Sequence, residues 1–370
     1  MLRERINSLE LLRVISMFLI LTTHFWGHCI DLKNIEPFAN GYIYGWLSKG
    51  VSYISVNTFV LVSAYFMCEK SYRSSRLINI EIQVLFYSIS IFCILLFSGS
   101  VTFSFKDLFE SLLPTLTGEY WFVTVFLGLL FLHPFLNIVI RSMTKRQHQL
   151  LCIVLILLFS VIPNIFFFSK WLNFGTGYGI VWFVSLYFFA SYVKIHVNID
   201  KIKAHRKLLY GLSVTALFLP FLSRVFIVLG TSAILGHPVG GGLFYGNNTI
   251  LCLLSTILVF LAFLTFNIKR NKLITFLSSG SFAVYLISDN PHLAPFIWGY
   301  VGSHIDLGTN LLPFVVNGWL LVIYFICTLI DYPRQFIHNL LNEKINIIGI
   351  KTDRLIKKLS DENTCKYCFD

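Results

Sequence analysis

Long apolar stretches recur along the whole chain, and they constrain its fold more than any other feature. A helix needs about 20 apolar residues to cross a hydrocarbon core about 30 Å thick. About ten stretches have this character, at 9–28, 46–67, 78–98, 120–140, 150–168, 177–195, 207–229, 247–267, 274–296 and 309–331. Runs such as Leu150–Phe159 are apolar on every side, which excludes the alternating strands of a membrane barrel. The sequence therefore predicts an all-α, polytopic integral membrane protein.

The composition supports this prediction. Hydrophobic residues make up 56% of the chain and charged residues only 13%, whereas about 25% of the residues in an average soluble chain are charged. The core of a soluble protein of this length could not bury so much apolar surface. The bilayer is therefore the expected solvent for most of the chain.

Lysine and arginine are concentrated in alternate loops. One set of loops and the N-terminal segment are rich in them: Arg3, Arg5, Lys70, Arg73, Arg76, Arg141, Lys145, Arg146, Lys194, Lys201, Lys203, Arg206, Lys207, Lys269, Arg270 and Lys272. The intervening loops hold only Lys33, Lys106 and Lys170. Because cytoplasmic loops are enriched in these residues, the pattern predicts an even number of spans with both termini in the cytoplasm.

The formal net charge of +11 does not indicate nucleic-acid binding, since the cations are dispersed over several loops and form no single basic face. The eight cysteines are scattered and imply no disulfide framework. Cys365 and Cys368 have the spacing of half a zinc site, but the sequence has no second pair, so we expect no metal.

The chain shows no linker and no repeat of fixed period. We therefore expect one membrane domain at residues 1–333 and a cytoplasmic tail at 334–370. The pair Asn290-Pro291 interrupts the ninth apolar stretch and predicts a broken helix there.

Ionisable side chains in a spanning helix are costly and therefore suggest function. The first stretch holds Glu10, Arg13 and His24, with His28 at its rim. Arg13 and His24 are eleven residues apart, about 16 Å and three turns along a helix, so they lie on nearly one face. We expect them to face one internal cavity. Two structural alternatives stay open at this point, namely an Arg13 that reaches the inner surface and a His24 that hydrogen-bonds a neighbouring helix.

Five segments, in order along the chain, resemble the acyltransferase 3 family, whose members typically O-acetylate cell-surface polysaccharides. They are Asn7–Ser16 with Arg13 and His24 separated by ten residues, Phe59–Phe66, Arg73-Ser-Ser-Arg76, Tyr120–Val123 and Ser281–Ile287. The chain departs from the family pattern at Ala64, where glycine is usual, and at Ser288, where many relatives carry histidine.

The resemblance implies that acetyl-CoA is the acyl-donor substrate and that no cofactor is bound. Its phosphates could contact Arg13, Arg73 and Arg76 in a bidentate manner, although loop arginines also commonly serve as topology determinants. Glu10, one turn before Arg13, could orient the guanidinium. His24 is the expected catalytic residue, either as a base for an acceptor hydroxyl or as a transient acyl carrier.

The acceptor side of the site is expected at the other end of the spans. Candidates for acceptor binding are Glu119, Tyr120, Trp121, Asp289 and Asn290. Aromatic residues at this depth stack on sugars but also anchor helices. Arg224 lies deep in the seventh stretch and needs a counter-charge or bound anion, for which Glu119 and Asp289 are candidates.

The sequence thus favours a plasma-membrane O-acyltransferase, most simply an O-acetyltransferase, acting on a capsular or exopolysaccharide unit. Its expected partners are acetyl-CoA, a cell-surface or lipid-linked glycan and membrane lipids. The alternative is a transporter or flippase of a lipid-linked sugar or polyanion, which would also explain charges within spans. The sequence leaves open the acceptor hydroxyl, the choice between acetyl and a longer acyl group, and the oligomeric state.

Overall fold

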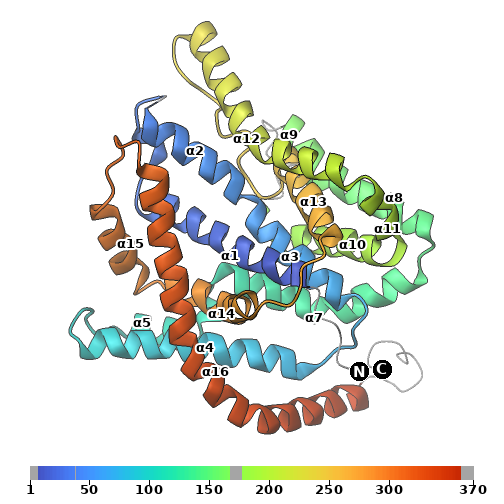
Figure 1. Ribbon diagram of the computed structural model, residues 1–370. Coiled ribbons are helices and arrows are strands. Elements are labelled where there is room, and N and C mark those ends of the chain that lie inside the picture. The colour runs from blue at the N-terminus through green and yellow to red at the C-terminus, as the bar shows by residue number, and fades with distance from the viewer. Residues whose placement is uncertain (1–6, 38, 167–176, 360–370) are drawn as a thin grey trace.

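The computed structural model describes residues 7–37, 39–166 and 177–359, and all regular structure in these ranges is helical (Figure 1). The main helices are α1 (Asn7–His28), α2 (Asn40–Ser52), α3 (Ile54–Met67), α4 (Ser74–Phe97), α7 (Trp121–Ser142), α8 (Lys145–Ile156), α10 (Ile180–His196), α12 (Arg206–Leu235), α13 (Ile250–Thr265), α14 (Lys272–Ser288), α15 (Ala294–Ser303) and α16 (Leu312–Leu359). Shorter pieces are η1 (Leu32–Asn34), α5 (Phe105–Leu112), α6 (Pro114–Thr117), η2 (Leu157–Val161), α9 (Ile162–Ile165) and α11 (Ile199–Ala204). The prediction of an all-α protein is confirmed.

Seven helical segments of the described ranges are long and apolar enough to cross a membrane. They are Asn7–His28, Asn40–Met67, Ser74–Phe97, Trp121–Ser142, Lys145–Ile165, Arg206–Leu235 and Leu312–Leu340. The sixth, eighth and ninth predicted stretches correspond to α10, α13 and α14, which are apolar but have only 16 or 17 residues. The count of ten spans is therefore not confirmed, and the orientation of the termini stays a prediction.

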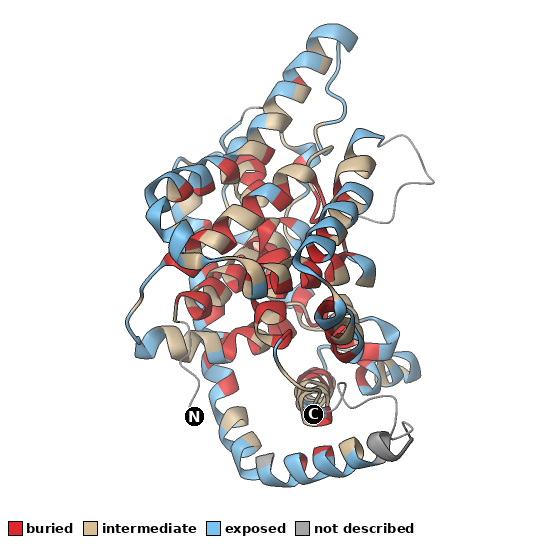
Figure 2. Cartoon of the chain, turned by 90° about the vertical axis from the view of Figure 1, so that its right-hand side faces the viewer, coloured by how far each residue is buried: buried red, intermediate tan, exposed pale blue. Residues whose placement is uncertain are grey.

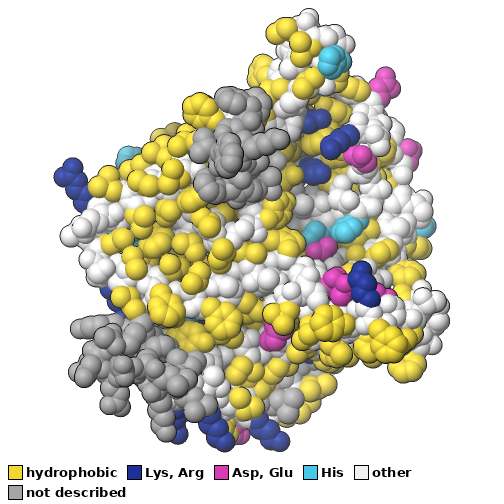
Figure 3. Space-filling model, turned by 180° about the vertical axis from the view of Figure 1, so that it is seen from behind, with side chains coloured by type: hydrophobic (Ala, Val, Ile, Leu, Met, Phe, Trp, Pro, Cys, Tyr) yellow, Lys and Arg dark blue, Asp and Glu magenta, His cyan; other side chains and the backbone are white. Residues whose placement is uncertain are grey.

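Helices α1 and α3 lie near the centre of the bundle. Helix α1 packs against α2, α3 and α14, and α3 also packs against α10 and α13. Buried residues gather in this central region, while the surrounding helices expose their outer faces (Figure 2). Seen from behind, much of the surface consists of hydrophobic side chains (Figure 3), as expected for a face that contacts lipid.

Small and hydroxylated residues allow the central helices to approach closely. Ser16 of α1 and Thr58 of α3 share a hydrogen bond of 2.7 Å. A Cβ atom added at Gly280 of α14 would lie 2.7 Å from the Cγ2 atom of Thr328 of α16. Helix pairs within membranes commonly use such small interface residues.

Helix α16 continues as one helix through the predicted domain boundary at 333, with Pro333 inside it. Near this point Asp331 is fully buried and accepts hydrogen bonds from Tyr87 (2.6 Å), Gln335 (2.7 Å) and Arg334. These hydrogen bonds explain how a carboxylate can be buried here.

Candidate functional site

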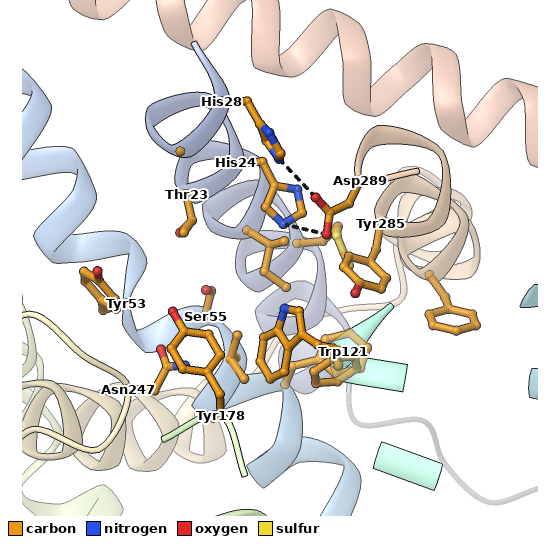
Figure 4. A pocket seen from close by; sticks show the side chains of 17 residues that line it. Thr23, His24, His28, Tyr53, Ser55, Trp121, Tyr178, Asn247, Tyr285 and Asp289 are labelled. Carbon is orange, nitrogen blue, oxygen red and sulfur yellow. Dashed lines mark hydrogen bonds and ion pairs between the residues drawn. The ribbon is translucent and has the colours of Figure 1, made fainter. Parts of the chain in front are cut away.

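A cavity of about 320 Å³ opens beside α1, and we call it the histidine cavity. Side chains from α1, α3, α7 and α14 form most of its wall, and loop residues complete it. Its lining is mainly apolar and aromatic but includes several polar groups (Figure 4). The lining residues are Met17, Ile20, Thr23, His24, Gly27, His28, Tyr53, Ser55, Val56, Phe59, Trp121, Phe122, Tyr178, Asn247, Phe282, Tyr285 and Asp289. An apolar pocket with a few convergent polar groups is typical of a ligand site.

Asp289 lies between two histidines of α1 (Figure 4). One carboxylate oxygen, Oδ2, lies 3.6 Å from Nε2 of His24, and the other, Oδ1, lies 3.2 Å from Nε2 of His28. The histidines are one helical turn apart and therefore present their rings on the same side of α1. The three side chains form one cluster that joins α1 to the end of α14.

Backbone geometry after α14 places Asp289 in this position. The helix ends at Ser288, as the pair Asn290-Pro291 predicted. The Asn290 side chain accepts hydrogen bonds from the backbone N–H groups of His292 and Leu293, each 3.1 Å long, and donates one of 2.8 Å to the Tyr120 hydroxyl. Because these bonds fix the turn, they also fix the direction of the neighbouring Asp289 side chain.

His24 is only 13% exposed, and its Nδ1 atom has no hydrogen-bond partner. Its Nε2 atom faces Asp289, while its ring lies 6.0 Å from the ring of Tyr285. A buried imidazole nitrogen without a partner is uncommon. A neutral imidazole nitrogen of this kind can accept a proton from a group brought within hydrogen-bond distance of it.

His28, which the sequence placed at the rim of the first apolar stretch without a role, is a member of the site. Its ring stacks on Trp298 with an interplanar angle of 5° and a centroid distance of 6.3 Å. The spacing of His24 and His28 by four residues was a usable signal, because such residues share a helix face. The acid between them could not be identified, since Asp289 is 261 residues from His28.

The five expected acceptor residues do not all reach the cavity. Trp121 and Asp289 line it, and Trp121 stands edge-on to Tyr178 at a centroid distance of 4.6 Å. Tyr120 and Asn290 are fully buried behind the wall, where Tyr120 donates to the backbone oxygen of Leu286.

Glu119 is outside the lining, in the turn before α7. Partial burial and the nearby Glu110 carboxylate raise its pKa. Acceptor contact by Glu119, Tyr120, Trp121, Asp289 and Asn290 stays a prediction.

Arg13 lines a second cavity of about 260 Å³, which we call the arginine cavity. Four serine residues share its wall: Ser63, Ser278, Ser279 and Ser281. The expectation that Arg13 and His24 share one cavity is therefore wrong. Phe59, Phe122 and Phe282, from three other helices, line both cavities, and helical spacing on α1 alone carries no information about such residues.

The other expected donor residues lie away from the arginine cavity. Arg73 caps the start of α4 and is exposed, and neither it nor Arg76 lines the cavity. Glu10 is buried on α1, one turn before Arg13. The roles of Arg73, Arg76 and Glu10 in donor binding stay predictions.

Arg224 contacts aromatic rings instead of the acids proposed for it. Its guanidinium carbon lies 3.4 Å from the ring centroid of Trp46 and 5.4 Å from that of Tyr42, and its Nε donates to the Tyr42 hydroxyl at 3.2 Å. Asp289 pairs with the two histidines. The expectation of an acidic partner was wrong because a ring face can also stabilise a cation.

Within the described ranges, no group of three or more histidine, cysteine or acidic side chains is arranged to hold a metal ion. Cys365 and Cys368, which suggested half a zinc site, lie outside the described residues.

The family model Acyl_transf_3, described as an acyltransferase domain, matches residues 6–330. The chain therefore belongs to this family and is a multi-pass membrane acyltransferase, which confirms the resemblance found in the sequence. No curated protein and no solved structure matches the chain.

Proposed function

We propose that this member of the acyltransferase 3 family is a plasma-membrane O-acetyltransferase that moves an acetyl group from cytoplasmic acetyl-CoA to a hydroxyl of a cell-surface glycan. The observation that carries the proposal is the His24–Asp289 pair in the wall of the histidine cavity. Membership in the family indicates that the reaction is an acyl transfer, and the His24–Asp289 pair provides the general base that such a reaction needs.

His24 acts as the general base in this proposal. The Asp289 carboxylate faces Nε2 of His24 and favours the tautomer in which Nε2 carries the imidazole proton. In that tautomer Nδ1 can accept the proton of the acceptor hydroxyl. The hydroxyl oxygen attacks the thioester carbonyl, the carbon–sulfur bond breaks, and the CoA thiolate takes up the proton from the imidazolium. Asp289 stabilises the positive charge that His24 carries in between.

The arginine cavity is where we place the donor. Arg13 offers a bidentate cation for a phosphate or carbonyl oxygen, and the four serine hydroxyls suit the amide groups of the pantetheine arm. Arg73 and Arg76 would contact the outlying nucleotide phosphates. This placement makes the reacting thioester approach His24 from the Arg13 end of α1.

The histidine cavity is where we place the acceptor. Trp121, Tyr178 and Tyr53 offer ring faces to a sugar, and the hydroxyls of Thr23 and Ser55 offer hydrogen bonds. Such a mixed lining recognises a compact polar molecule with apolar faces, which describes a sugar ring. Asp289, next to the turn that the Asn290 side chain stabilises, would contact both the base and the acceptor.

The proposed function is tested by placing the donor and the acceptor on opposite sides of a membrane. The full chain is placed in proteoliposomes with labelled acetyl-CoA on the Arg73 side and the glycan fraction of the source cells on the other. We expect label to appear on the glycan, and His24→Ala to abolish this transfer without lowering the inserted amount of protein. His237→Ala, which changes an exposed loop histidine, is the matched control.

Three other results would change the assignment. Movement of intact glycan between compartments without label transfer would favour the transporter or flippase. Transfer that requires donor and acceptor in one compartment would refute the cross-membrane arrangement but retain the acyltransferase. Label kept on the wild-type protein after rapid denaturation at neutral pH, and absent from His24→Ala, would show that His24 carries the acyl group in place of the base role.

A further inference from the structure

The histidine cavity and the arginine cavity end on the same three phenylalanines. Phe59 of α3, Phe122 of α7 and Phe282 of α14 line both cavities, and no other described residue does. Three separate helices therefore each contribute one ring to a common wall. On one side of this wall is Arg13, and on the other is the His24–Asp289 pair.

The three rings differ in how firmly they are held. Phe122 is buried, and its ring packs against Phe126 at 5.6 Å and Phe183 at 5.7 Å. Phe59 meets Phe122 edge-to-face at 5.6 Å and is only partly buried, as is Phe282. Phe122 is thus the most buried ring of the wall, whereas Phe59 and Phe282 each keep part of their surface exposed.

We propose that Phe59, Phe122 and Phe282 form an aperture that selects the acyl group by its cross-section. This inference rests on the proposed function, in which the thioester enters from the arginine cavity and reacts beside His24. The reacting carbonyl must then pass between these rings. The bonds made and broken are those of the transfer described above, so the aperture adds no chemical step.

Cross-section and length are controlled by different features in this arrangement. A linear acyl chain passes end-on and needs an opening no wider than its methyl group, whereas a chain branched next to the carbonyl needs a wider one. Linear length is limited separately, by the 320 Å³ of the histidine cavity, which must also hold the acceptor hydroxyl. The ratio of branched to linear transfer therefore reports on the aperture alone.

The experiment compares butyryl-CoA with isobutyryl-CoA, which have the same number of carbons, and includes acetyl-CoA as the reference donor. The full chain in proteoliposomes transfers each acyl group to the glycan fraction of the source cells, and NMR of the glycan measures the products. One misplaced methyl group in a fitted site costs about 10–200-fold in rate. We expect the wild-type ratio of isobutyryl to butyryl transfer to be below about 1:10 on this basis.

The variants enlarge the aperture one ring at a time. Phe282→Ala and Phe59→Ala should each raise the ratio at least about tenfold. Ile80→Ala is the control, because Ile80 of α4 lines the arginine cavity but not the histidine cavity and should leave the ratio unchanged. If an alanine variant does not fold, Phe282→Leu replaces it, because leucine removes less volume and should still raise the ratio of isobutyryl to butyryl transfer.

The outcomes separate the two proposals. If the wild-type chain transfers no acyl group from any donor, the proposed function fails and the aperture fails with it. If acetyl transfer occurs but the branched-to-linear ratio is the same in the wild type and in the folded Phe59 and Phe282 variants, the aperture is refuted while the function stands. An equal rise of the ratio in Ile80→Ala would also overturn the assignment to these three rings.

Discussion

Replacing Asp289 by asparagine tests the central pair of the site with almost no change in shape. Asparagine keeps the size and one oxygen of aspartate but removes the charge, and its amide nitrogen can donate a hydrogen bond to His24. The ring then has no reason to keep its proton on Nε2, and Nδ1 is no longer held ready to accept one. We expect the rate of acyl transfer to fall while the fold is retained.

The size of the effect follows from the geometry. Two unit charges separated by 3.6 Å, the distance from His24 Nε2 to Asp289 Oδ2, interact by about 5 kcal/mol at an effective dielectric constant of about 20. The Asp289 side chain is 17% exposed, so solvent screens part of this energy. About half, or roughly 2.5 kcal/mol, corresponds to a loss of about 50- to 100-fold in rate.

The assay is transfer of labelled acetyl from acetyl-CoA, with the inserted protein quantified for each variant. Asp306→Asn is the matched control, because Asp306 is exposed and accepts a hydrogen bond from the backbone N–H of Gly308, away from the histidine cavity. The reasoning is refuted if Asp289→Asn keeps activity within about twofold of the wild type while His24→Ala is inactive. That result would mean that His24 works without an orienting carboxylate.

Three further changes test other parts of the molecule. Arg13→Lys should raise the KM for acetyl-CoA about tenfold or more, since an ammonium group cannot make the planar bidentate contact of a guanidinium. An unchanged KM would argue against a contact between Arg13 and the donor. Arg224→Ala should lower the free energy of unfolding by about 1–2 kcal/mol, because the contact of the guanidinium with Trp46 is lost. Thermal unfolding would measure this loss, and a transfer assay should show little change in activity per folded molecule. Burial and the Glu110 carboxylate raise the pKa of Glu119, so the wild-type protein should lose stability as pH rises above the ordinary pKa of 4.5. Glu119→Gln should flatten this pH dependence of thermal unfolding, and equal slopes in the two proteins would count against the raised pKa.

The sequence alone predicted the class of the fold because the bilayer imposes a strict length and polarity on every crossing segment. All ten predicted stretches contain helix in the described ranges, and the break at Asn290-Pro291 follows α14 as expected. The number of true spans could not be predicted as firmly. A helix such as α10, with 17 residues, is surrounded by other helices, and its apolar character then reflects contact with protein as well as with lipid.

The sequence by itself also identified Arg13 and His24 as candidates, because both are ionisable residues in one apolar stretch, where burying a charge is costly. Only the tertiary structure decided what these residues face. The pairing of Asp289 with His24 and His28, the aromatic surroundings of Arg224 and the wall formed by Phe59, Phe122 and Phe282 all join residues from different helices. Local periodicity fixes which face of its own helix a side chain occupies, but the packing of the helices fixes which residues meet there.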